Sequence, residues 1–134
     1  MNHDDVQGWL DRYVACWLSY DEAAIGELFS EDAEYRYQPW GKPVAGREAI
    51  VKDWVAPNGD PSKADAPGTF EAAYAPYAVD GDVAVAVGTT TYWKDATRAE
   101  VVRAYHNVYL LKFDADAKCR SFTEHYMELP KPKA

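Results

Sequence analysis

Apolar positions at the start of the chain recur with the period of a helix. Over residues 6–20 they fall at every third or fourth position and form one stripe, as expected for a helix that packs one side against a core. Asp4 and Asp5 stand just before the stripe, where they can cap free N–H groups and complement the helix dipole. Asp21 is placed to cap a second, shorter helix over residues 22–29. The first thirty residues therefore predict two consecutive helices.

Alternation of apolar and polar residues takes over further along the chain. Residues 33–37 alternate as a short strand, and residues 47–55 return to helical spacing. Asp80-Gly81 is a favoured hairpin turn. Longer strands are predicted, with turn residues between them, over 69–79, 82–93, 98–113 and 118–129. Helices followed by a meander of antiparallel strands predict an α+β domain, in which the helices pack on one face of a single sheet.

Residues 56–68 are the one long stretch without periodicity, and they contain three prolines and two glycines. A loop of this length in a small domain is either a lid over a functional site or a disordered segment, and both readings stay open. Residues 130–134 read Pro-Lys-Pro-Lys-Ala and are expected to form a frayed tail. The length of the chain otherwise predicts a single domain over residues 1–134.

Composition excludes several classes of protein. With 48% hydrophobic residues the chain is too apolar to be disordered. Its net charge of -8 argues against binding to nucleic acid, whose phosphates require a basic surface, and against binding to an anionic membrane. No apolar run is long enough to cross a bilayer, and the acidic N-terminus lacks the regions of a signal peptide. We therefore expect a cytoplasmic protein.

No motif for a metal or a cofactor stands out. Cys16 and Cys119 lie on different predicted elements without the spacing of metal ligands, so we interpret them as buried, reduced thiols. The chain has no Gly-rich phosphate loop, no Ser/His/Asp set and no CxxC pair. We expect no cofactor and no metal site.

Amphipathic rings are abundant, with ten tyrosines and five tryptophans. Each ring offers apolar area with a polar tip, so a surplus indicates a lined cavity or an interface. The alternative is that rings at helical and strand spacing simply form the core. Ala84, Ala86 and Gly88 share the interior face of their predicted strand, where small residues leave space under large rings. This observation favours a cavity.

The order of the elements and several short segments resemble the NTF2-like superfamily. The segments are the apolar pattern of residues 13–29, Ser-Glu-Asp-Ala at 30–33, the helix start Gly-Arg-Glu-Ala-Ile at 46–50, and the last hairpin with Glu-His-Tyr at 124–126. The chain is most similar to the SnoaL-like and ketosteroid isomerase-like branch. The resemblance covers nearly the whole chain.

This resemblance implies an NTF2-like cone, in which a strongly curved, mostly antiparallel sheet wraps round the N-terminal helices and encloses an apolar pocket. Members of the superfamily include isomerases, dehydratases, cyclases and non-catalytic binders, so the fold alone does not set the function.

The ketosteroid isomerase pattern is only partly matched. Its oxyanion-stabilising tyrosine falls on Tyr13, within Arg-Tyr-Val-Ala at 12–15. Its general-base aspartate falls on Tyr37, and its second oxyanion acid falls on Tyr109. A neutral phenol with a pKa near ~10 cannot replace a carboxylate base at pH 7. Steroid isomerase chemistry is therefore not expected.

Strand pairing indicates which residues of the last hairpin face the interior. A turn at 114–117 pairs Phe113 with Lys118, and counting outward gives the other partners. One face then has the pairs Tyr109–Phe122, Asn107–Glu124, Tyr105–Tyr126 and Arg103–Glu128, and the other has Val108–Thr123 and His106–His125. Lys112 suits solvent and belongs to the second face, so the first face is the interior one.

The predicted pocket combines this face with the first helix, the first strand and the third helix. Arg103 and Glu128 are expected to form an ion pair near the mouth, and Trp9 and Trp54 to close one end. The residues expected to bind a ligand are Tyr13, Trp17, Tyr35, Tyr37, Trp54, Tyr105, Asn107, Tyr109, Phe122, Glu124 and Tyr126.

Glu124 is the carboxylate that the pairing places deep among aromatic rings. Burial there would raise its pKa and suit it to acid/base work near neutral pH, as in SnoaL-like cyclases, which are similar in using a carboxylate beside a carbonyl. The alternative is structural, because Glu124 can accept a hydrogen bond from Asn107 and fix the hairpin.

The outer face of the sheet is the predicted dimer interface. His106 and His125 oppose each other there, but two histidines make a poor zinc site, since zinc takes three or four ligands. Val83, Val85, Val87, Val108 and Leu110 supply an apolar patch on the same convex face, which is often a dimer interface in the resembled superfamily.

Two functions follow from the sequence. The first is a cofactor-independent isomerase, cyclase or dehydratase that acts on a small, apolar, oxygenated molecule such as an aromatic ketone or a polyketide-like compound. In it Glu124 moves the proton, and Tyr13 and Tyr109 donate hydrogen bonds to a developing oxyanion. The second is a non-catalytic binder or carrier that uses the same residues as anchors.

Overall fold

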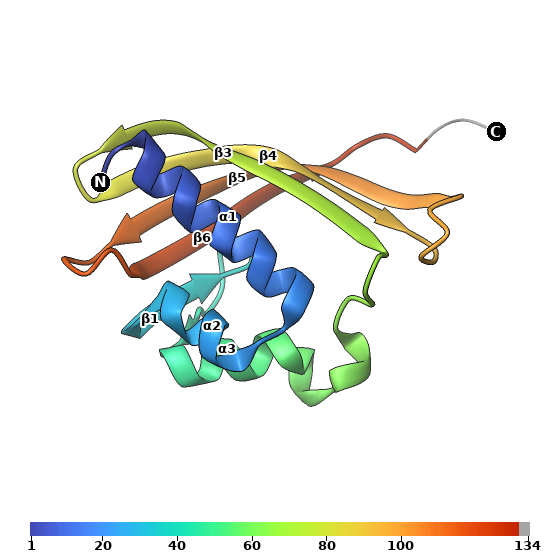
Figure 1. Cartoon of the computed structure of the whole chain (residues 1–134), viewed down its shortest axis with the longest axis horizontal. Helices are drawn as coiled ribbons and strands as arrows, with labels where there is room; N and C mark the ends of the chain where they lie inside the picture. Colours follow the sequence, from blue (N-terminus) through green and yellow to red (C-terminus); the bar gives the residue numbers. More distant parts are fainter. Residues whose placement is uncertain (132–134) are drawn as a thin grey trace.

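The computed structural model describes residues 1–131 and shows helices packed against one curved sheet (Figure 1). The helices are α1 (His3–Ser19), α2 (Glu22–Leu28) and α3 (Arg47–Val55), followed by the short 3-10 turns η1 (Pro57–Gly59) and η2 (Pro61–Lys63). The strands are β1 (Phe29–Arg36), β2 (Val44–Ala45), β3 (Phe70–Asp80), β4 (Val83–Trp93), β5 (Val101–Phe113) and β6 (Cys119–Glu128). The predicted α+β class is confirmed.

The first two helices begin at side-chain caps. Asn2 caps α1: its Oδ1 accepts from the backbone N–H of Asp5 at 2.8 Å, and the Asp5 carboxylate accepts from the Asn2 N–H at 2.9 Å. Asp5 thus contributes to a cap, as expected, but the helix starts three residues earlier than the periodicity indicated. Asp21 caps α2 as predicted, accepting from the N–H of Ala24 at 3.0 Å.

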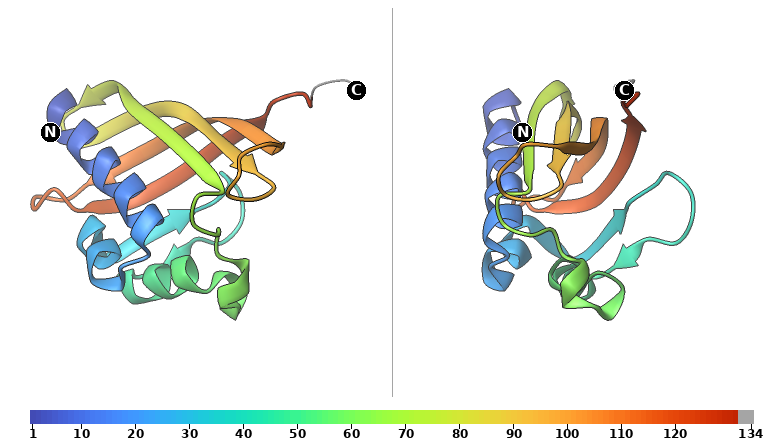
Figure 2. Two further views of the ribbon diagram at one scale, coloured as in Figure 1. Left: turned by 45° about the vertical axis from the view of Figure 1, so that its right-hand side comes forward. Right: turned by 90° about the vertical axis from the view of Figure 1, so that its right-hand side faces the viewer.

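The sheet has the order β2-β1-β6-β5-β4-β3, with β1 parallel to β6 and every other pair antiparallel. Figure 2 shows how strongly it curves, with α1 lying along the concave side. The helix α1 packs mainly on β3, whereas α3 packs on β1. The concave face is therefore covered by helices, which confirms the cone expected from the resemblance.

The register of the last hairpin differs from the prediction by two residues. Ala117 adopts a left-handed conformation in the turn, and a bulge separates the Lys112–Ser121 pair from the Phe113–Cys119 pair. Each adds one residue to the β6 side. The observed partners are Tyr109–Glu124, Asn107–Tyr126, Tyr105–Glu128, Leu111–Phe122, Val108–His125 and His106–Met127. The predicted pairs were wrong, but a shift of two leaves every side chain on its predicted face.

The connection between β4 and β5 is also longer than predicted. Arg98 adopts a left-handed conformation and β5 begins only at Val101, so residues 94–100 form a loop instead of a tight four-residue turn. The side chains again lie on the predicted faces of the sheet, because Gly88 pairs with Asn107 and Ala86 with Tyr109. Ala84 and Ala86 are buried, as expected of the interior face.

The core is a stack of rings beneath the cone. Tyr13 of α1 packs against Trp9, at a centroid distance of 5.5 Å, and against Phe122, at 5.4 Å, and these two rings also lie 6.3 Å from each other. Phe122 in turn stacks on Tyr35 at 4.3 Å with nearly parallel planes. Offset stacking of this kind adds to the free energy gained from burial. Much of the aromatic surplus is thus core, and several of these core rings also line a cavity.

None of the helices in residues 1–131 is long and apolar enough to cross a membrane. Of the predicted frayed tail, Pro130 and Lys131 lie outside any helix or strand, and the other three residues lie outside the described part of the chain.

Candidate functional site

A cavity of about 580 Å³ opens within the cone, bounded by α1, α3 and the concave face of the sheet. Its wall is aromatic with a few polar groups, as in many small-molecule sites. The aromatic lining consists of Tyr13, Trp17, Tyr20, Tyr35, Tyr37, Trp54, Tyr74, Tyr92, Tyr105, Tyr109 and Tyr126. The polar side chains include Asp53, Asp65, Glu124, Lys63, Arg103, Thr90 and Asn107.

All but one of the residues predicted to bind a ligand lie on this wall. The exception is Phe122, which is fully buried in the ring stack and pairs with Leu111, one row deeper than predicted. The two-residue shift in register explains the difference. Trp9 is likewise a core residue, because it is fully buried, and its indole donates to the carbonyl of Leu28 at 3.0 Å.

Glu124 stands at the inner part of the cavity, opposite Tyr109 in the sheet. Burial raises its pKa to about 7, and hydrogen bonds from Tyr109 and Asn107 partly oppose this effect by stabilising the carboxylate. The Asn107 amide donates to Glu124 Oε1 at 3.4 Å. A carboxyl with this pKa is present in both protonation states at neutral pH, so it can take up or release a proton there.

The tyrosine hydroxyls around Glu124 are already paired within the protein. The Tyr13 and Tyr35 hydroxyls lie 2.8 Å apart, so one donates to the other and the second keeps a proton free for a ligand. Tyr109 has hydrogen-bonding contact with both Tyr74 and Glu124, and its single proton serves one of them at a time. Burial raises the pKa of Tyr13, Tyr35 and Tyr109 well above 10, so all three stay neutral.

Tyr37 follows directly after β1, and its hydroxyl donates to Asp53 Oδ2 at 2.5 Å. Burial, reinforced by this bond to Asp53, raises the pKa of Tyr37. Since its proton points at Asp53, the oxygen of Tyr37 presents lone pairs to the cavity. Tyr37 is thus an acceptor at the place where the isomerase pattern has a base.

The mouth of the cavity is closed on one side by residues 57–65. Asp65 accepts from the Trp17 indole at 3.1 Å, and its backbone N–H donates to the Tyr20 hydroxyl at 3.0 Å. Burial raises the pKa of Asp65, while the Trp17 bond and the charge of Arg103 lower it. The segment without periodicity therefore forms part of the cavity wall, and disorder, the other reading, does not apply to it.

Arg103 and Glu128 do not form the ion pair expected at the mouth. The guanidinium of Arg103 lies over the ring of Tyr92, 4.2 Å from its centroid. Glu128 pairs with Tyr105 and accepts its hydroxyl proton at 3.3 Å. The shift in register moves Glu128 away from Arg103.

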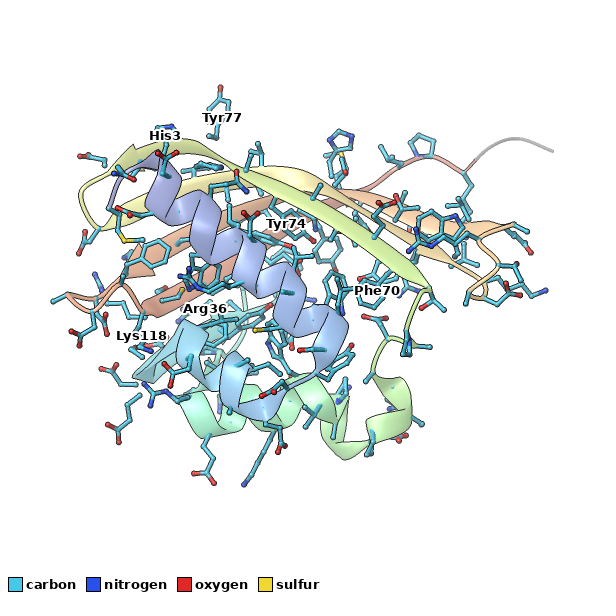
Figure 3. The ribbon with its side chains drawn as sticks, in the orientation of Figure 1. His3, Arg36, Phe70, Tyr74, Tyr77 and Lys118 are labelled. Carbon is cyan, nitrogen blue, oxygen red and sulfur yellow. The ribbon has the colours of Figure 1, made fainter. Side chains whose placement is uncertain are left out.

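Several lining residues went unrecognised in the sequence. Thr90 and Tyr92 share the parity of the small interior residues on β4, so the alternation signal contained them. Tyr74 of β3 pairs with Gly88 of β4. Tyr74 and Phe70 point to the inner side of β3, whereas Tyr77 points away from the molecule (Figure 3). Asp65 has no such signal, because its segment lacks periodicity.

No group of three His, Cys, Asp or Glu side chains in residues 1–131 is arranged to hold a metal ion. His106 and His125 pair with Met127 and Val108 respectively, so the direct opposition predicted for the two histidines was wrong. Cys16 and Cys119 are free and buried, and burial raises the pKa of both thiols, which keeps them unreactive.

Comparison with known proteins agrees with this geometry. Residues 10–121 match the family described as SnoaL-like domain. A similar solved structure is an NTF-2 like protein of unknown function from Burkholderia xenovorans LB400, with a TM-score of 0.67 and 14% sequence identity. The likeness covers 97% of this chain and 88% of that one, and at this identity it speaks for the fold alone. No curated protein matches the chain. The structural likeness shows an NTF2-like fold, and the family match over most of the chain shows that the protein belongs to the SnoaL-like domain family.

Proposed function

We propose that the cavity binds a small, largely apolar, oxygenated molecule, such as an aromatic or polycyclic ketone, and that Glu124 moves a proton on it without a cofactor. The observation that carries this proposal is one carboxyl with a pKa of about 7 inside a tyrosine-lined cavity. The reaction class is that of an isomerase, cyclase or dehydratase.

In this mechanism the Glu124 carboxylate takes a proton from the carbon beside a carbonyl group. The electron pair of the broken C–H bond moves toward the carbonyl oxygen, which becomes an oxyanion. Tyr109 and the Tyr13–Tyr35 pair supply hydroxyl protons to that oxygen, in a site where they need little reorganisation. Return of the proton from Glu124 to another carbon completes an isomerisation.

Exchange of protons for deuterons tests the proposal. A panel of bicyclic aromatic ketones in D₂O at pH 7 is followed by NMR for exchange beside the carbonyl, with the wild-type protein and with Glu124→Gln. We expect faster exchange than in buffer with the wild type, and loss of that acceleration with the variant. Equal exchange with both proteins would overturn the catalytic role of Glu124.

A carrier without catalysis is the second candidate, and a specific observation favours it. The hydroxyls of Tyr13, Tyr37 and Tyr109 all have partners inside the protein, which suits a rigid wall for ligand binding. A carrier would bind ketones of the same panel with an affinity that is flat from pH 5 to 8, and would leave their exchange rates unchanged. An affinity that follows the titration of Glu124 argues for the enzyme.

A homodimer through the outer face of the sheet is part of the proposal. Val83, Val108 and Leu110 are exposed there to 40%, 37% and 44%. Val108 and Leu110 lie on β5, whose neighbours β4 and β6 shield its edges, so the apolar patch stands in the middle of a sheet. Large apolar side chains in such a position are typical of a protein interface.

A further inference from the structure

Three side chains on neighbouring strands lead in sequence to Glu124. The Tyr74 hydroxyl of β3 lies 2.5 Å from Thr90 Oγ1 of β4. Thr90 in turn donates to Asn107 Oδ1 of β5 at 2.8 Å, and Asn107 Nδ2 faces Glu124 Oε1 of β6 at 3.4 Å. Tyr74, Thr90 and Asn107 are all buried, so water does not compete for these bonds.

The orientation of the Asn107 amide, with Oδ1 toward Thr90 and Nδ2 toward Glu124, sets the direction of every bond in this chain. An amide oxygen can only accept, so the single proton of the Thr90 hydroxyl goes to Asn107. Tyr74 must therefore donate to Thr90. With its oxygen engaged by Thr90, Asn107 turns its NH₂ group toward Glu124. All three donors point toward the carboxyl.

We propose that Thr90, held by Tyr74, is a positioning residue that fixes the Asn107 amide with its NH₂ toward Glu124 and so stabilises the carboxylate form. Without the Thr90 proton, the amide is free to turn its oxygen to Glu124, which would favour the protonated acid instead. The proposal concerns the protonation of Glu124. Its importance for a reaction rests on the proposed function.

A missing Cβ atom makes the arrangement possible. Gly88 lies between Tyr74 and Asn107 in the register of the sheet. A Cβ at this position would come within 2.1 Å of the Ala73 carbonyl oxygen and 2.4 Å of Tyr74 Cδ1. The Tyr74 ring occupies the space that a side chain would take. The interior glycine therefore serves the hydrogen-bond chain, and its space is not part of the open cavity.

Besides this chain, one other group among the described residues stabilises the Glu124 carboxylate, the Tyr109 hydroxyl. The charge of Glu124 acts on six tyrosines from α1, β1, the residue after β1, β3, β4 and β5, which are Tyr13, Tyr35, Tyr37, Tyr74, Tyr92 and Tyr109. Burial raises the pKa of each of them, so they are neutral near pH 7. Among the described residues, the groups that lower the pKa of Glu124 are the Tyr109 hydroxyl and the Asn107 amide. The same cavity is also lined by Asp53, Asp65 and Arg103, which are not among the causes of the shift in the pKa of Glu124.

Carbon NMR tests the proposal directly and needs no ligand. The protein is labelled with ¹³C at the glutamate carboxyl carbons, titrated from pH 4 to 9, and the Glu124 resonance is assigned by its absence in Glu124→Gln. We expect Thr90→Val to raise the Glu124 midpoint by about one pH unit, since a hydrogen bond to a charged group is worth roughly that much. Thr90→Ser keeps a hydroxyl and should leave the midpoint in place.

A double variant separates positioning from a general loss of packing. Asn107→Leu should raise the midpoint at least as far as Thr90→Val, and adding Thr90→Val to it should cause no further shift. An unchanged midpoint in Thr90→Val, or full additivity of the two shifts, would overturn the proposal.

The wild-type protein offers a measurement that no folding defect can obscure. The two side-chain amide protons of Asn107, observed with ¹⁵N labelling, should shift with the same midpoint as the Glu124 carbon. Amide protons that ignore this titration would show that the NH₂ group faces elsewhere. Neither result depends on ketone exchange, so the positioning role and the proposed function can fail separately.

Discussion

A single carboxyl among phenol rings ionises less readily than one in water, because the rings exclude water without supplying a full positive charge. Glu124 is in this situation, because among the described residues only the neutral donors Tyr109 and Asn107 oppose the rise in its pKa. The same environment that suits it to proton transfer makes its ionised form costly to the fold. Protonation and stability are therefore linked at this residue.

The free energy of unfolding should fall as pH rises through the range in which Glu124 ionises. The unfolded glutamate has a pKa of 4.5 and the folded one about 7, so between these values the folded state binds more protons. Stability is unaffected by this group below pH 4.5, declines up to pH 7 and is then constant, with a total loss of up to about 3 kcal/mol. Urea unfolding of the wild type and Glu124→Gln at each pH measures the difference between the two curves.

The variant should abolish that part of the decline, because the amide of glutamine does not ionise. Glu31→Gln, at an exposed site, is the control and should run parallel to the wild type. Parallel curves for Glu124→Gln as well would show that Glu124 has an ordinary pKa.

Replacement of glycine by alanine is expected to have opposite effects on stability at positions 88 and 8. Gly88→Ala forces a Cβ against the Ala73 carbonyl and the Tyr74 ring, and should destabilise the fold by about 1–3 kcal/mol. Gly8→Ala lies inside α1, where the new Cβ would meet only Arg12 at 3.5 Å. It should stabilise the fold by about 0.5–1 kcal/mol through helix propensity. Thermal unfolding of both variants measures the contrast, and a stabilised Gly88→Ala would contradict the packing described for Tyr74.

At the scale of elements, the sequence predicts what is periodic. The stripe of α1, the cap of α2 at Asp21 and all of α3 follow from local chemistry. The inward faces of the long strands were also predictable, because the bulge near Arg120 and the left-handed Ala117 together shift the register by an even number. The residue pairs were not predictable, since the composition of residues 114–121 does not indicate a bulge.

The segment over residues 57–65 shows the limit of that reasoning. Prolines and local hydrogen bonds form its two 3-10 turns, but its attachment to the cavity wall comes from bonds of Asp65 to Trp17 and Tyr20, far away in the sequence. No local pattern carries such information. The two bonds of Asp65 that hold the segment in the cavity wall can each be tested by substitution.

Removal of the Asp65 side chain should loosen this segment. In Asp65→Ala the Trp17 indole loses its acceptor, and we expect faster amide hydrogen exchange over residues 57–65 with little change in β4 and β5. Asp65→Asn is the matched control, because its amide oxygen can still accept from Trp17 and the cost of a buried charge is gone. Exchange measured by mass spectrometry should be close to wild type for that variant. If both variants leave the segment protected, the Trp17 bond does not hold it.

For the whole molecule, the cone divides its apolar residues between two surfaces. The concave face buries the ring stack and builds the cavity, while the convex face leaves Val83, Val108 and Leu110 in contact with solvent. The order of elements was enough to predict helices on one face of a single sheet, and the resemblance to the NTF2-like superfamily implied the cone. The exposed apolar patch on the convex face is the feature on which the proposed dimer rests.

Substitution of Leu110 tests whether a second copy completes it. Leu110 is 44% exposed at the centre of the sheet, so Leu110→Lys would place a charge inside the proposed interface and should convert the protein to a monomer. Leu18→Lys is the matched control, since Leu18 is 55% exposed on α1, which packs on the opposite, concave face. Sedimentation velocity at several concentrations should give a dimer for the wild type and Leu18→Lys. A monomeric wild type would show that the proposed dimer does not form. A Leu110→Lys variant that stays dimeric would show that the contact lies elsewhere, because a stable interface does not tolerate a buried lysine without a partner.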